Sequence, residues 1–168
     1  MIQDEVTLED MLSARESRAM HQSELIDRYD MPLISFTVIM PGSIKRNAFS
    51  KKIFSMGKEA LEKALCPYGI KFFDEKDQKT GYEAFYCVDL PAETLKRITV
   101  DIEDGSRVGR LFDLDVISKD KTPISRSELG LGERLCLICD RPAHACSRSH
   151  LHSTEELLKE IERVLSDE

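Results

Sequence analysis

The chain has 168 residues, of which 41% are hydrophobic and 33% charged, and its formal net charge at pH 7 is −7. These values predict one soluble globular domain, residues 1–168, and exclude a disordered or fibrous chain. The acidic balance argues against nucleic-acid binding, and no apolar run is long enough to cross a membrane. Because the first twenty residues lack a secretory pattern, we expect a cytoplasmic protein whose five cysteines are reduced or bind metal.

A long helix is predicted near the start of the chain. Thr7 and Asp10 resemble a capping box, and apolar positions at helical spacing extend to about Tyr29. Three polar residues interrupt this apolar face: Arg15, Arg18 and Gln22. Two interpretations are open, because the arginine stems can lie on the surface and pair with local acids, or the face can line a pocket for an anion.

The next segments alternate between strands and helices. Strands are expected over 33–40, 70–75, 82–90, 98–103 and 110–117. Helices are expected over 43–65 and 91–98, and Lys45 adds positive charge at the start of the first of them, where free backbone N–H groups attract anions. The order predicts an α+β fold, with a ferredoxin-like βαββαβ core, an added strand and the N-terminal helix.

The last part of the chain differs from the rest. Residues 133–152 are loop-like and rich in cysteine and histidine, and a C-terminal helix begins at Ser153 with Glu156 completing a capping box. The apolar positions of this last helix predict that it packs on the body of the domain.

Two aspartates stand in the predicted strand "GRLFDLDV". Asp113 and Asp115 point to one face because side chains alternate along a strand. Neighbouring carboxylates repel unless a cation lies between them, and Mg²⁺ commonly takes one or two carboxylates together with substrate phosphates. The preceding predicted strand offers Glu103, or Asp101, as a further carboxylate. The alternative is a solvent-exposed sheet face with no metal.

A second motif lies in the Cys/His-rich segment. Cys136, Cys139 and Cys146 are followed by His150 and His152, a set from which a three-Cys, one-His zinc site can be built. Three buried free thiols are an equally open interpretation, and a catalytic cysteine is a weaker one. Arg134 and other arginines flank the segment, so it can also form the edge of a phosphate site.

The sequence resembles the apo-citrate lyase phosphoribosyl-dephospho-CoA transferase family over nearly its whole length. The resemblance is carried by "GRLFDLDV" and "SRSELGLGERLCLICDRPAHACSRSHLHS", and also by "ARESRAMHQSELI" and "PLISFTVIMPGSIK". Two stretches, "IMPG" and "SRSHLHS", depart slightly from the pattern of the family. By its resemblance to the family pattern, His152 fits better than His150 as the histidine of the zinc set.

This resemblance implies a nucleotidyltransferase. Such enzymes transfer 2′-(5″-triphosphoribosyl)-3′-dephospho-CoA to a serine of the citrate lyase acyl carrier protein, the gamma chain, and release diphosphate, usually with Mg²⁺. It implies that Asp113 and Asp115 hold the metal, with Glu103 as helper. The residues expected to bind the phosphates of the donor are Arg15, Arg18, Gln22, Lys45, Arg110 and Arg134.

Two other functions are compatible with the sequence. One is the same chemistry on a different acceptor. The other is a non-catalytic zinc module that binds a carrier protein during assembly of the lyase. The enzyme predicts that Asp113→Asn abolishes transfer, whereas the zinc module predicts that this substitution is harmless.

Overall fold

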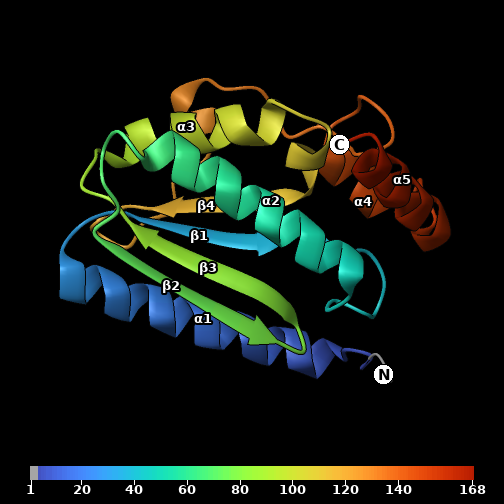
Figure 1. Cartoon of the computed structure of the whole chain (residues 1–168), viewed down its shortest axis with the longest axis horizontal. Helices are drawn as coiled ribbons and strands as arrows, with labels where there is room; N and C mark the ends of the chain where they lie inside the picture. The colour runs from blue at the N-terminus through green and yellow to red at the C-terminus, as the bar shows by residue number, and fades with distance from the viewer. Residues whose placement is uncertain (1–3) are drawn as a thin grey trace.

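The computed structural model describes residues 4–168, and its central feature is a four-stranded antiparallel sheet (Figure 1). The strands are β1 (Leu33–Val38), β2 (Phe72–Gln78), β3 (Gly81–Cys87) and β4 (Phe112–Ile117). They lie in the order β2-β3-β1-β4, and each neighbouring pair is antiparallel. The predicted α+β class is confirmed.

Helices cover both faces of the sheet. In Figure 1, α1 (Leu8–Tyr29) lies on one side, and α2 (Ala48–Leu65) and α3 (Ala92–Asp104) lie on the other. The arrow of β1 points toward α4 (Ala143–Ser149) and α5 (Thr154–Ser166). Two short 3-10 helices, η1 (Val108–Leu111) and η2 (Ser127–Leu129), complete the elements. Within residues 4–168, no helix has an apolar stretch that would reach across a membrane.

The starts of the helices follow from local capping. Thr7 accepts the backbone N–H of Asp10 while the Asp10 carboxylate accepts that of Thr7, which confirms the predicted capping box of α1. Ser153 and Glu156 form the predicted box at α5. Asn47 and Ser50 form a third box, so α2 begins at Ala48 instead of 43 and Lys45 lies in the loop before the helix.

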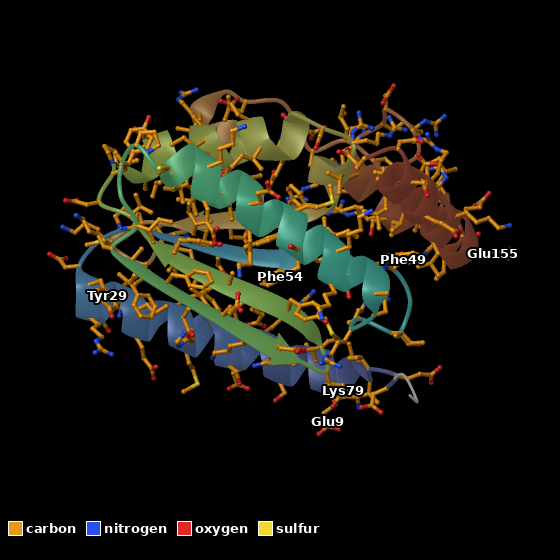
Figure 2. All side chains as sticks on the ribbon, in the orientation of Figure 1. Glu9, Tyr29, Phe49, Phe54, Lys79 and Glu155 are labelled. Atoms are coloured by element: carbon orange, nitrogen blue, oxygen red, sulfur yellow. The ribbon has the colours of Figure 1, made fainter. Side chains whose placement is uncertain are left out.

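Two apolar layers hold the helices to the sheet. The larger layer lies between the sheet and α2, α3 and α5, and it includes Phe36, which stacks on Phe54. α2 comes close to β1 at Gly57, where an added Cβ would lie 2.2 Å from the Phe36 ring. The smaller layer lies under α1, where Tyr29 stacks on Phe72. Figure 2 shows Tyr29 and Phe54 on opposite sides of the sheet.

The predicted strand over 98–103 is wrong, and with it the strand added to the core. These residues continue the helix that begins at Ala92, so α3 extends to Asp104. Ile98, Thr99 and Val100 favour a strand locally because they are β-branched. Leu95, Thr99 and Glu103 recur at helical spacing and are all buried where the helix packs on the rest of the protein. This tertiary packing outweighs the local preference for a strand.

The two edges of the sheet differ. At the outer edge of β4, Glu103 accepts the backbone N–H of Leu114 at 3.0 Å and Arg134 donates to the carbonyl of Phe112 at 2.8 Å. The backbone N–H of Ile124 donates to the carbonyl of Val116 at 2.9 Å. The opposite edge is β2, which has a partner strand on one side only.

Candidate functional site

The α1 face of the sheet has an apolar half and a polar half. Under the C-terminal half of α1, Leu25 and Ile26 belong to one layer with Leu33 and Phe85. Further along this face, the strand register brings together five polar residues: Ser35, Thr37, Glu83, Asp113 and Asp115. Because alternate residues of one strand share a face, it takes three adjacent strands to gather this set.

The polar residues of α1 reach this half of the sheet. Arg18 Nε donates to Glu83 Oε1 at 3.1 Å, and Gln22 Nε2 donates to Ser35 Oγ at 2.9 Å. Arg18 therefore pairs with a carboxylate on β3 and not with an acid on its own helix. Arg15 has no hydrogen bond or ion pair with residues 4–168. The face of α1 that carries these residues turns toward the sheet, as the sequence predicted.

Arg15 and Arg18 line a cavity of about 210 Å³, which we call the polar cavity. Its polar lining residues are Arg15, Arg18, Thr37, Lys45, Thr80, Tyr82, Glu83 and Asp113. Lys45 Nζ donates to the carbonyl of Met40 at 2.6 Å, and burial lowers the pKa of its ammonium group. Three cationic side chains thus converge on one face of an acidic protein, beside the carboxylate of Asp113.

The two predicted aspartates lie on β4 as the sequence indicated. Asp113 Oδ1 accepts Arg134 Nη2 at 3.2 Å, and its other oxygen lies 3.4 Å from Thr37 Oγ1. The Asp115 side chain is exposed to solvent on one side, and many protein atoms lie around the rest of it. The loss of water on that side, and then repulsion from Asp113, raises the pKa of Asp115 to about 6. Attraction to Lys96 and Arg134 opposes this rise.

Glu103 lies elsewhere, because it belongs to α3 and not to a strand. Its carboxylate is 2% exposed, accepts the Leu114 backbone N–H, and pairs with Arg126 and with Arg134 at 3.0 Å. Asp101 is exposed on α3. Among residues 4–168, Asp113, Asp115 and Glu103 do not gather into a three-carboxylate cluster of metal-ligating geometry. Glu103 instead holds Arg134, which contacts Asp113.

Three arginines from the predicted phosphate set already have protein partners, and one of them is Arg18, which pairs with Glu83. Arg134 binds Phe112 O, Glu103 and Asp113. Arg110 Nη1 donates to the carbonyl of Cys136 at 2.8 Å and pairs with Asp140 at 3.3 Å. Arg110 therefore anchors the Cys/His-rich segment to η1, and Arg134 joins that segment to β4.

The Cys/His-rich segment brings four ligand atoms together. The sulfurs of Cys136, Cys139 and Cys146 and a ring nitrogen of His152 all lie within 4.8 Å of one another. Cys139 Sγ is 3.4 Å from Cys146 Sγ and 3.5 Å from His152 Nε2. With zinc–sulfur bonds of about 2.3 Å, two thiolates on one tetrahedral zinc are about 3.8 Å apart. The cluster can hold a metal such as zinc, and His152, not His150, completes it.

The thiols of this cluster differ in acidity. A backbone N–H of Arg141, then His152, stabilises the thiolate of Cys139 and lowers its pKa to about 6. Burial, then the neighbouring Cys139, raises the pKa of Cys146 to about 12. Cys139 therefore ionises readily and Cys146 does not, and a bound cation would favour the thiolate form of both.

A larger cavity, of about 560 Å³, lies between this segment and the loop that follows β1. Ile39 and Met40 line both this cavity and the polar cavity. The segment contributes Leu135, Leu137 and residues of α4, and α5 contributes Leu157 and Ile161. The two cavities are therefore neighbours at the end of β1.

Sequence reasoning missed four polar residues of the polar cavity, Thr37, Thr80, Tyr82 and Glu83. Glu83 shares its face of β3 with Phe85 and Cys87 and is 4% exposed. A carboxylate at an inward position of an apolar strand needs a partner, and this position in "YEAFYC" was the signal available in the sequence.

Comparison with known proteins identifies the family of this chain. The family model described as apo-citrate lyase phosphoribosyl-dephospho-CoA transferase matches residues 6–168. A Vibrio cholerae protein named "Probable apo-citrate lyase phosphoribosyl-dephospho-CoA transferase" is 40% identical over 165 residues, covering 96% of this chain and 93% of its own. An Escherichia coli protein with the same name, without "Probable", is 32% identical over 164 residues, covering 96% and 90%.

A longer relative is also similar. The Haemophilus influenzae protein CitXG is 32% identical over 161 residues, which cover 95% of this chain and 35% of that protein. The match of the family model over almost the whole chain, together with these relatives, shows that the chain belongs to the apo-citrate lyase phosphoribosyl-dephospho-CoA transferase family of enzymes.

Proposed function

We propose that this enzyme transfers the phosphoribosyl-dephospho-CoA group from its triphosphate donor to a serine of the apo-citrate lyase acyl carrier protein. The names of the family and of the relatives support the donor and the lyase. The observation that carries the proposal is the polar cavity, where Arg15, Arg18 and Lys45 converge beside Asp113 in a protein of net charge −7. Such a cluster suits a polyphosphate.

In the proposed reaction, the serine oxygen attacks the phosphorus nearest the ribose. A serine oxygen–phosphorus bond forms, and the bond from that phosphorus to the next bridging oxygen breaks. The diphosphate leaves with the electron pair, and the serine proton passes to a carboxylate. Arg15, Arg18 and Lys45 would bind the leaving diphosphate and stabilise the charge that develops on it, with Gln22 holding the sheet beneath α1.

The proton acceptor is proposed to be a member of the aspartate pair. The pKa of Asp115, raised to about 6 in the metal-free protein, would fall once Mg²⁺ binds, so this role rests on the position of its carboxylate next to Asp113. Arg134 holds Asp113 in place, and Glu103 holds Arg134, so Glu103 acts as a positioning residue. Arg110 would act through the Cys/His-rich segment that it anchors.

The site also fits Mg²⁺. Asp113 and Asp115 project from one face of β4, and the charge of Asp113 raises the cost of ionising Asp115, which a bound cation would relieve. We propose that these two carboxylates hold Mg²⁺ together with phosphate oxygens of the donor, as is common for this ion. When bound, the ion supplies positive charge to the transferring and leaving phosphates.

Three further proposals concern the framework. Cys136, Cys139, Cys146 and His152 bind zinc as a structural ion, supported by ligand atoms that all lie within 4.8 Å of one another. The strand order β2-β3-β1-β4, with α2 and α3 on one face, supports a ferredoxin-like core within one domain, residues 1–168. Free thiols at all five cysteines suit a reducing compartment, and this supports a cytoplasmic location.

The direct test is intact-mass spectrometry of the apo acyl carrier protein after incubation with this enzyme, the triphosphoribosyl donor and Mg²⁺. We expect a gain equal to the phosphoribosyl-dephospho-CoA group, and no gain with the Asp113→Asn/Asp115→Asn variant. A gain that persists in the variant would disprove the role of the aspartates. A gain only on another carrier protein would disprove the proposed acceptor.

A further inference from the structure

We infer that the larger cavity binds the dephospho-CoA part of the donor, so that the donor lies across both cavities with its reacting phosphorus beside Asp113. This inference rests on the proposed function, because it takes the identity of the donor from it. It assigns a ligand to the space between the Cys/His-rich segment and the end of β1, beyond the phosphates and the aspartate pair.

The placement of the cavities matches the bond that breaks. Ile39 and Met40 line both cavities, and Arg134, which lines the larger one, contacts Asp113 in the smaller one. In the reaction, diphosphate leaves one side of the transferring phosphorus and the ribosyl-dephospho-CoA stays on the other. The polar cavity would bind the leaving diphosphate and the larger cavity the dephospho-CoA part, with the transferring phosphorus between them.

The charge of the lining suits an anionic ligand. Among the described residues that line the larger cavity, Arg110 and Arg134 are cationic and none is Asp or Glu, and both arginines also pair with carboxylates that lie outside the lining. His144 and His150 also line it. The whole chain has 31 acidic residues, so their absence from this lining is notable. Within residues 4–168, the side chains of His144 and His150 have no hydrogen-bond partner, which leaves their ring nitrogens available to a ligand. Dephospho-CoA has a diphosphate that needs such groups.

The apolar lining suits the rest of the same molecule. Ile39 and Leu135 line the cavity and are 39% and 36% exposed, so they present apolar surface to a ligand there. Met40, Leu137 and Ile161 are buried behind them. A mixed ligand with an adenine ring, a diphosphate and a long pantetheine arm would cover this apolar surface. The volume of about 560 Å³ is within the range of about 300–1,000 Å³ typical of small-molecule sites.

A matched pair of substitutions on α4 tests the inference. Ala143 lines the larger cavity, whereas Ala145, two residues further along the helix, is exposed and does not. Dephospho-CoA itself is the probe, titrated by calorimetry in the absence of carrier protein. We expect similar binding to the unmodified enzyme and to Ala145→Phe, and binding weaker by roughly tenfold or more to Ala143→Phe. Equal binding to the two variants would overturn the inference.

A second variant and a kinetic measurement distinguish a filled cavity from a misfolded protein. Ser147→Phe fills the same cavity from the exposed side of α4, and bound metal per chain reports whether the Cys/His-rich segment is intact in each variant. In the transfer assay we expect both filling variants to raise the KM for the donor and to leave the KM for the carrier protein unchanged. A rise in the carrier KM alone would assign the cavity to the carrier and overturn the inference.

The inference and the proposed function fail in different ways. If the enzyme transfers the group but the alanine pair does not differ, the cavity assignment is wrong and the function stands. If no transfer occurs to any carrier protein but dephospho-CoA still distinguishes Ala143→Phe from Ala145→Phe, the ligand of the cavity is established and the proposed function is wrong.

Discussion

The polar cavity and the Cys/His cluster are assembled in opposite ways. The cavity takes its side chains from α1, β1, β3, β4 and the loop after β1, most of which helix and strand hydrogen bonds hold in place. The cluster takes its four side chains from the segment 133–152, whose regular structure is one isolated bridge, Leu135 with Pro142, and the short helix α4. The cavity should therefore keep its shape when empty, whereas the cluster should depend on its metal.

Removal of the metal is the strongest test of this difference. Because a structural zinc supplies about 10 kcal/mol or more to a small site, chelation is expected to abolish ordering of residues 133–152 and, with it, transfer. The sheet should survive. Hydrogen exchange should rise throughout the segment and stay low in β1 and β3. Cys139→Ser should behave like chelation, and Cys66→Ser, an exposed cysteine outside the cluster, should not. Unfolding of the sheet together with the segment would contradict the comparison.

Arg134 is the place where the two regions meet, so its removal should damage the cavity and spare the cluster. Arg134→Ala leaves Glu103, 2% exposed, with one cationic partner fewer, and we expect a loss of about 2 kcal/mol in the free energy of unfolding. Transfer should fall by about 10²-fold because Asp113 loses its partner. Zinc content should not change. Arg141→Ala, at an exposed arginine of the same segment, is the control, and an equal effect there would rule out a specific link.

The two arginines of α1 should separate ligand binding from stability. Arg15→Ala removes a cation without a partner in residues 4–168, so we expect the donor KM to rise about tenfold with stability unchanged within about 0.5 kcal/mol. Arg18→Ala leaves the buried Glu83 unpaired and should also cost about 1–3 kcal/mol. Donor kinetics and urea unfolding of both variants measure this. Equal loss of stability in the two would show that Arg15 is a structural residue.

The smallest effect is expected from pH. The pKa of Asp115 in the folded protein is raised from its ordinary value of 3.8 to about 6, so between these values the folded state binds more protons than the unfolded state. Its contribution to stability is therefore lost as pH rises from about 4 to 6. Without divalent metal, urea unfolding should show this trend in the unmodified enzyme and a weaker trend in Asp115→Asn. An identical pH dependence would show that Asp115 titrates normally.

The sequence predicted what local pattern controls. The capping boxes at Thr7 and Ser153, the alternation that puts Asp113 and Asp115 on one face, and the spacing of the cysteines all depend on residues near one another in the chain. The polar face of α1 was also visible, because helical periodicity places Arg15, Arg18 and Gln22 together.

What the sequence did not reveal depends on distant contacts. The segment 98–103 became helix because its burial against the body outweighed its β-branched residues, and this moved Glu103 from the predicted metal set to a pair of arginines. The segment that forms helix α4 was expected to be a loop, because seven residues are too few to show a helical periodicity of apolar side chains. Glu83 joined the cavity through the register of β1 with β3, which no local pattern specifies.

The unequal edges of the sheet decide how the molecule can associate with other chains. The edge of β4 has its backbone groups occupied by side chains of Glu103 and Arg134, so it cannot template a further strand. Only β2 is left for strand addition, and its run of Asp74, Glu75, Lys76 and Asp77 places charge on both faces of the sheet. An intruding strand would have to bury these charges. The enzyme is thus protected against edge-to-edge aggregation by covering one edge and charging the other.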